Sequence, residues 1–117
     1  MIRPSAIGWL GTRTPHYEEM ARFAEQVLGL TPVAREDGMT VFRLPNGDLF
    51  EVFGPDNPGG GHPPEGVVGG FVVEDVEAAA EELRAAGCEV GELQGDGGAQ
   101  WVYFRAPDGN LYELTTH

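Results

Sequence analysis

The feature that most constrains the fold is an internal repeat within the 117 residues. The segment from Phe42 to Val52 (FRLPNGDLFEV) is echoed, in the same order and without gaps, from Phe104 to Leu114 (FRAPDGNLYEL). Each copy places a Pro-Asn-Gly or Pro-Asp-Gly turn between two strand-like runs, and the turn glycine can adopt the positive φ that tight hairpins need. Two matching hairpins predict that a larger structural unit has been duplicated.

A helix-like segment precedes each hairpin. In the first half, Thr14 is the predicted N-cap, Pro15 the first helical residue and Gly29 the stop. In the second half, Asp75 is the predicted cap and Gly87 the stop. The apolar residues of the first helix fall at helical spacing: Met20, Phe23, Ala24, Val27 and Leu28. Those of the second do the same: Val76, Ala79, Ala80 and Leu83. Both patterns are typical of amphipathic helices that pack on a sheet.

Strand-like runs flank both helices, near residues 7–13 and 31–36 in the first half and near 67–73 and 88–93 in the second. Each half therefore has the order β, α, β, β, β. The sequence predicts one α+β domain over 1–117, with a first module at 1–54, a Pro- and Gly-rich linker at 55–66 and a second module at 67–117.

Composition and charge exclude some classes of binding partner for this protein. Nineteen acidic and seven basic residues give a net charge of -12, which disfavours nucleic acid and anionic membranes. This charge either keeps the protein soluble or attracts a cationic small molecule. A hydrophobic content of 41% supports a core, and no apolar run approaches the length of a membrane span. Cys88 is the single cysteine, so no intrachain disulfide forms. Without a leader-like N-terminus, we expect a soluble, cytoplasmic protein.

Three segments together resemble the vicinal oxygen chelate superfamily of glyoxalases, bleomycin-resistance proteins and extradiol dioxygenases. They are VLGL at 27–30, FVVEDVEA at 71–78 and YFRAPDGNLYEL at 103–114, of which the last is the most specific. The resemblance covers essentially the whole chain. It implies paired βαβββ modules that form an incompletely closed mixed β-barrel around a cavity, with one helix packed outside each module.

The resemblance also implies where a metal ion would bind. Metal-binding members place a His or Glu on the first strand and a Glu on the last strand of each module, and these positions fall on Trp9, Glu51, Val68 and Glu113. Tryptophan and valine cannot coordinate a metal, which needs about three or four N, O or S donors. No cofactor is therefore predicted, and a divalent metal is disfavoured. Three histidines are expected to be solvated or locally bonded surface residues, at a helix start, in the linker and at the chain end: His16, His62 and His117.

The two remaining glutamates are candidate acid or base groups. Strand alternation places Glu51 and Phe53 on one face of their strand and Glu113 on the corresponding face of the last strand. Since the helices cover the other face, both carboxyl groups should point into the cavity, where desolvation disfavours the charged form. The alternative is that each glutamate opens to water or only accepts hydrogen bonds from a neighbouring arginine: Arg13, Arg43 or Arg105.

The candidate ligand-contacting residues are mostly aromatic: Trp9, Phe53, Val68, Trp101 and Tyr103. An indole at position 9 fills volume or stacks on an aromatic or cationic ligand. Trp101 and Tyr103 share one face of their strand, which is either cavity wall or core. Gly69 and Gly70 either let a backbone or ligand approach closely or mark a bulge.

The sequence favours a protein that binds a small organic molecule, cationic or aromatic, in a barrel cavity without a conventional metal site. One alternative is a metal-dependent lyase, isomerase or dioxygenase that uses Glu51 and Glu113. Another is a metal-free enzyme with one glutamate as its base. A homodimer is expected, because two half-barrels leave sheet edges that a partner can cover.

Overall fold

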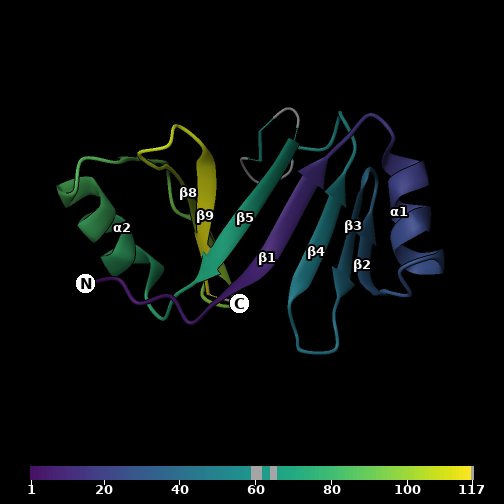
Figure 1. The fold of residues 1–117 in the computed structure, drawn as a ribbon, viewed down its shortest axis with the longest axis horizontal. Coiled ribbons are helices and arrows are strands. Elements are labelled where there is room, and N and C mark those ends of the chain that lie inside the picture. Colours follow the sequence, from purple (N-terminus) through teal and green to yellow (C-terminus); the bar gives the residue numbers. More distant parts are fainter. Residues whose placement is uncertain (59–61, 64–65, 117) are drawn as a thin grey trace. The chain divides into compact units, whose positions relative to one another are not determined.

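The computed structural model describes residues 1–58, 62–63 and 66–116 and contains one helix in each half of the chain (Figure 1). The linker residues 59–61 and 64–65 and the terminal His117 lie outside the described residues. The elements, in order, are β1 (Ala6–Arg13), α1 (Tyr17–Gln26), β2 (Thr31–Glu36), β3 (Met39–Arg43), β4 (Leu49–Phe53), β5 (Gly66–Val72), α2 (Val76–Ala85), β6 (Glu89–Val90), β7 (Gln94–Gly95), β8 (Gln100–Arg105) and β9 (Leu111–Thr115). The α+β class predicted from the repeat is confirmed.

The chain forms two compact units. One comprises Met1–Trp9 together with Gly69–His117, and we call it the discontinuous unit. The other comprises Leu10–Val68, and we call it the continuous unit. The chain passes from one unit to the other within β1 and again within β5. A single strand can therefore contribute side chains to both units.

In the continuous unit, β3 pairs antiparallel with β2 and with β4, β1 lies next to β4, and α1 covers β3 and β4 (Figure 1). The predicted turn between β3 and β4 forms, and Gly47 adopts a φ of 93°. The core consists of Ala24, Phe42 and Val52, with half-buried apolar neighbours around them. Because Phe50 and Val52 pack toward α1, the alternation of β4 places Glu51 on the opposite face, as predicted.

The start of α1 differs from the prediction. The helix begins at Tyr17, its N-cap is His16, and no side chain caps it. The Thr14 hydroxyl instead accepts a hydrogen bond from the backbone N–H of His16 at 3.0 Å. His16 is the residue immediately before the helix. The predicted roles of Thr14 as cap and Pro15 as first helical residue are therefore wrong, because the local Thr14 bond stabilises a turn that delays the helix.

The end of α1 is only partly as predicted. Gly29 does stop the helix, with a φ of 69°, and the Leu30 N–H donates to the Ala24 carbonyl at 3.0 Å. However, the helix ends at Gln26, so Val27 and Leu28 lie beyond its last turn. Three members of the predicted apolar stripe are solvent-exposed: Phe23, Val27 and Leu28.

The discontinuous unit contains a mixed set of strands covered by α2 (Figure 1). β9 pairs in parallel with β5 and antiparallel with β8, and β8 also pairs with β6 and β7. The Asp75 carboxylate accepts a hydrogen bond from the Ala78 N–H at 3.0 Å, which confirms the predicted cap. The predicted stripe is also confirmed, because Val76, Ala79 and Ala80 are buried and Leu83 packs beside them.

The strand predicted near 88–93 is shorter than expected. It consists of the two-residue strands β6 and β7, separated by residues whose side chains are exposed. After β6, the Gly91 N–H still donates to the Tyr103 carbonyl at 2.8 Å, and the pairing resumes only at Gln94. Within the described part of the chain, no helix is long and apolar enough to cross a membrane.

Candidate functional site

Glu113 lies in the middle of the discontinuous unit. It is on β9, opposite Gly70 of β5 on one side and Tyr103 of β8 on the other. The neighbouring residues Val102 and Leu114 pack into the core that α2 covers. Glu113 and Tyr103 therefore lie on the face opposite α2, as alternation predicts. This register also places Trp101 and Tyr103 on that face, which the sequence left open.

Trp9 contacts the same point of the backbone as Glu113. A β carbon built on Gly70 would lie 3.2 Å from Oε1 of Glu113, 3.2 Å from Cε3 of Trp9 and 3.3 Å from its Cβ. Both side chains are only 3% exposed. The hydrogen side chain of Gly70 thus lets a buried indole and a buried carboxyl group meet over β5. Of the two sequence interpretations of Gly70, close approach is the one that the structure supports.

Polar and aromatic side chains surround this contact. Tyr103 and Thr115 are buried, and Trp101 is half-buried directly across from Thr115. We call the set formed by Trp9, Gly70, Trp101, Tyr103, Glu113 and Thr115 the Trp9–Glu113 cluster. A buried carboxyl group beside aromatic rings offers both oxygen atoms for hydrogen bonds and π faces. These groups are suited to an organic cation or an aromatic molecule.

The other predicted site residues belong to the continuous unit. Glu51 is half-buried on β4 and pairs with Val41 of β3, and Phe53 is buried at the end of the same strand. Val68 is buried on β5, at the boundary where this unit ends. The structure therefore brings Trp9, Tyr103 and Glu113 together in one unit and places Glu51, Phe53 and Val68 in the other.

Arg13 is a buried residue that the sequence suggested only as one of three possible hydrogen-bond donors to a glutamate. Its guanidinium donates hydrogen bonds to the carbonyl oxygens of Pro63 (2.9 Å), Gly54 (2.7 Å) and Asn57. Its central carbon also lies 5.2 Å from the centre of the Phe53 ring. Arg13 thus ties the end of β1 to the segment that follows β4, and the face of Phe53 is already occupied by a cation.

His62 is locally bonded but buried, so the prediction of a surface position for it is wrong. It is 6% exposed, its Nδ1 lies 3.0 Å from the Pro63 carbonyl oxygen, and its ring centre lies 5.0 Å from that of Phe53. Burial lowers the pKa of His62 below its usual 6.5; the nearby Arg13 charge acts in the same direction, while backbone hydrogen bonds at Pro63 and Gly11 oppose it. Composition predicted a linker at 55–66, and Arg13 binds carbonyl groups of this segment at Asn57 and Pro63.

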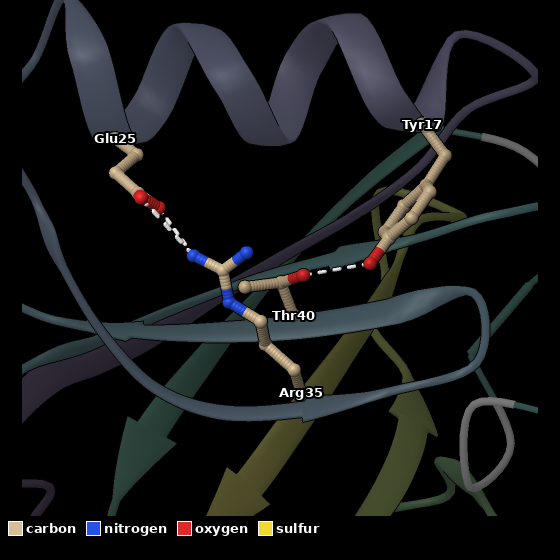
Figure 2. A network of polar contacts seen from close by, with 4 residues as sticks. All are labelled: Tyr17, Glu25, Arg35 and Thr40. Atoms are coloured by element: carbon tan, nitrogen blue, oxygen red, sulfur yellow. Dashed lines mark hydrogen bonds and ion pairs between the residues drawn. The ribbon is translucent and has the colours of Figure 1, made fainter.

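A separate groove lies between α1 and the β2–β3 hairpin (Figure 2). It has a volume of about 350 Å³, and the Tyr17 and Thr40 hydroxyls form a hydrogen bond of 2.6 Å in it. Figure 2 also shows the Arg35 guanidinium reaching the Glu25 carboxylate, an ion pair between β2 and α1. These two contacts join α1 to the β2–β3 hairpin across the groove.

Comparison with known families assigns the fold. Residues 6–114 match the family model described as Glyoxalase/Bleomycin resistance protein/Dioxygenase superfamily. The chain belongs to this superfamily. The resemblance inferred from the sequence is thereby confirmed over nearly the whole chain. No curated protein sequence matches the chain.

Several solved structures share the fold of this chain. The Mn(II)-bound glyoxalase from Novosphingobium aromaticivorans aligns over 98% of this chain and 40% of its own, with a TM-score of 0.79 and 22% identity. The 2,3-dioxygenase LapB from Pseudomonas sp. KL28 aligns over 96% and 39%, with a TM-score of 0.71 and 27% identity. Methylmalonyl-CoA epimerase from Mycobacterium tuberculosis aligns over 96% and 87%, with a TM-score of 0.74 and 16% identity. The chain thus spans less than half of the glyoxalase and of the dioxygenase.

The metal arrangement that the superfamily implies does not fit these residues. At two of the four implied positions stand Trp9 and Val68, whose side chains offer no metal-binding atom and are buried. The indole of Trp9 occupies the space beside Glu113 over Gly70. Among residues 1–58, 62–63 and 66–116, no group of three or more His, Cys, Asp or Glu side chains is arranged to hold a metal ion. Glu51 and Glu113 alone supply too few donors.

Proposed function

We propose that this superfamily member binds a small organic molecule, cationic or aromatic, at the Trp9–Glu113 cluster and does so without the family's metal arrangement. The observation that carries the proposal is the packing of Trp9 beside the buried Glu113 carboxyl group over Gly70. Where metal-binding relatives place a ligand to the metal, this chain has an aromatic ring. In this proposal the Glu113 carboxyl group contacts an organic ligand where the family's arrangement would use a metal ion.

The charge and chemistry of the cluster support a cationic ligand. A carboxylate neutralises an ammonium group, and indole and phenol faces attract the same charge through their quadrupoles. The net charge of -12 raises the local concentration of cations around the whole protein. An aromatic cation would use both features, because its ring can stack on Trp9, Trp101 or Tyr103 while its charge faces Glu113.

A metal-dependent reaction at Glu51 and Glu113 is the second candidate. Similarity in fold to the Mn(II)-bound glyoxalase favours it. Trp9 and Val68 count against it, because the metal would have to complete its coordination with water or substrate. The two candidates differ in a measurable way: the first needs Glu113 and Trp9, whereas the second needs both glutamates and an added metal.

Thermal denaturation in the presence of EDTA tests the proposal. The probes are benzyltrimethylammonium and tetramethylammonium, with benzyl alcohol as a neutral control and benzoate as an anionic one. A ligand at 100 times its Kd stabilises the folded state by about 2.7 kcal/mol, which raises the Tm of a domain of this size by about 10 °C. We expect the quaternary ammonium probes to raise the Tm and benzoate to have no effect.

Matched variants then locate the site. Glu113→Gln should abolish the shift, Trp9→Leu should weaken it, and Glu51→Gln, at the equivalent position of the first repeat, should preserve it. Equal loss in Glu51→Gln and Glu113→Gln, together with tight Mn or Zn binding to the unmodified protein, would favour the metal-dependent candidate. Unchanged Tm with every cation would refute the proposal.

A further inference from the structure

A second pocket lies wholly within the continuous unit, where the turn after α1 meets the turn after β3. Its volume is about 330 Å³, at the small end of the range for ligand sites. Its lining comes from two short segments: Gly29, Leu30, Thr31 and Val33, and Arg43, Leu44 and Pro45. None of these residues belongs to the Trp9–Glu113 cluster. The walls are mainly apolar, and Arg43 is the sole charged residue in the lining.

A β-bulge places Val33 at this pocket. In the pairing of β2 with β3, Pro32 pairs with Phe42 and Ala34 with Val41, so Val33 is skipped. A bulge redirects the side chain of the extra residue out of the regular alternation of a strand. Val33 lines the pocket and remains 46% exposed, which leaves apolar surface that a ligand can cover.

The internal repeat shows what distinguishes Arg43. Its equivalent in the second half is Arg105, which donates to the Gly109 carbonyl of its own turn at 2.8 Å and lies 3.8 Å from the Glu89 carboxylate. The Arg43 side chain makes no such hydrogen bond or ion pair with any residue that the structure describes. The same hairpin therefore uses its arginine internally in one copy and presents it to a pocket in the other.

We infer that this pocket binds a small apolar carboxylic acid, with its carboxylate on Arg43 and its hydrocarbon part against Leu30, Val33 and Leu44. The planar guanidinium matches a carboxylate with two parallel hydrogen bonds. In a protein of net charge -12, an anion needs a local cation of this kind, and the surrounding walls select an apolar body. The site is independent of the function proposed for the Trp9–Glu113 cluster.

The test compares acids with their uncharged amides. Hexanoate and 3-phenylpropionate, and the corresponding primary amides, are titrated into the full chain at pH 7 while backbone amide resonances are followed by NMR. We expect the carboxylates to bind about fivefold more tightly than the amides, as for one partly exposed ion pair. The largest shifts should fall on residues 29–33 and 43–45.

Substitutions at the two equivalent arginines of the repeat distinguish an effect of the Arg43 charge on binding from a general effect on the structure. Arg43→Met keeps the apolar stem and should reduce acid affinity to that of the amide, whereas Arg105→Met should leave both affinities unchanged. Val33→Glu, at an exposed position, should weaken acid binding by repulsion without changing the fold. Equal affinity for acid and amide, shifts elsewhere, or full acid affinity in Arg43→Met would each overturn the inference.

Discussion

Replacing Gly70 with alanine tests the packing on which the candidate site depends. The new methyl group would lie 3.2 Å from Oε1 of Glu113, 3.2 Å from Cε3 of Trp9 and 3.3 Å from its Cβ. These distances are shorter than ordinary van der Waals separations, and both neighbours are buried. The indole or the carboxyl group must therefore move by a few tenths of an ångström, in a region where close packing leaves little space.

The expected change in the free energy of unfolding on Gly70→Ala substitution follows from two opposing effects. Overpacking of a core costs about 1 to 3 kcal/mol. Alanine in a strand interior recovers about 0.5 to 1 kcal/mol through the smaller entropy of the unfolded chain. We expect Gly70→Ala to lower the free energy of unfolding by roughly 0.5 to 2 kcal/mol and the Tm by about 2 to 8 °C.

Gly69→Ala is the matched control, because its β carbon would meet only Cγ2 of Ile7 at 4.0 Å. It should leave the Tm unchanged or raise it slightly. In the double variant Trp9→Leu with Gly70→Ala, the smaller side chain should relieve part of the Gly70→Ala penalty, which a double-mutant cycle measures. Equal Tm values for the two glycine variants would refute the contact between Trp9, Gly70 and Glu113.

Three further predictions concern caps, buried charge and pH. Asp75→Ala should cost about 1 kcal/mol, or about 4 °C in Tm, and Thr14→Ala less, because only Asp75 bonds a helical N–H. Arg13→Met should cost roughly 2 to 4 kcal/mol in urea denaturation, since three carbonyl groups lose their donor. Because the His62 pKa is lowered in the folded state, its contribution to stability should be complete above pH 6.5 and decline as the pH falls below 6.5, where the unfolded chain binds the proton first. His62→Gln should flatten that part of the urea midpoint profile, whereas His16→Gln, at an exposed side chain, should not.

The fold could be predicted from the repeat because local backbone preferences and tertiary packing favour the same structure at the turns and at the helix cap. Gly47 and Gly109 adopt positive φ in equivalent turns, and Asp75 caps α2. Alternation also predicted the direction of Glu113, since Leu114 packs toward α2. These features depend on short-range geometry with a period of two residues or 3.6 residues, which a sequence displays directly.

The errors arise where long-range contacts decide the outcome. His62 lies in a segment rich in glycine and proline, and its burial involves two residues outside that segment, the Phe53 ring and the more distant Arg13, which binds the Pro63 carbonyl. The exposure of Val27 and Leu28 follows from the end of α1 at Gln26, two residues before the apolar pattern ends at Leu28. The face of Tyr103 required the register of β8 with β9. None of these three features can be predicted from the residues next to it in the sequence.

The metal content of untagged protein, purified without chelators, tests the central claim most directly. The claim is that the indole of Trp9 beside Glu113 makes the site unsuited to a metal ion and suited to an organic molecule. Elemental analysis by mass spectrometry should find Mn, Fe, Ni and Zn far below one equivalent per chain, in the unmodified protein and in Glu113→Gln alike. One equivalent of any of these metals, lost on Glu113→Gln substitution, would contradict the account.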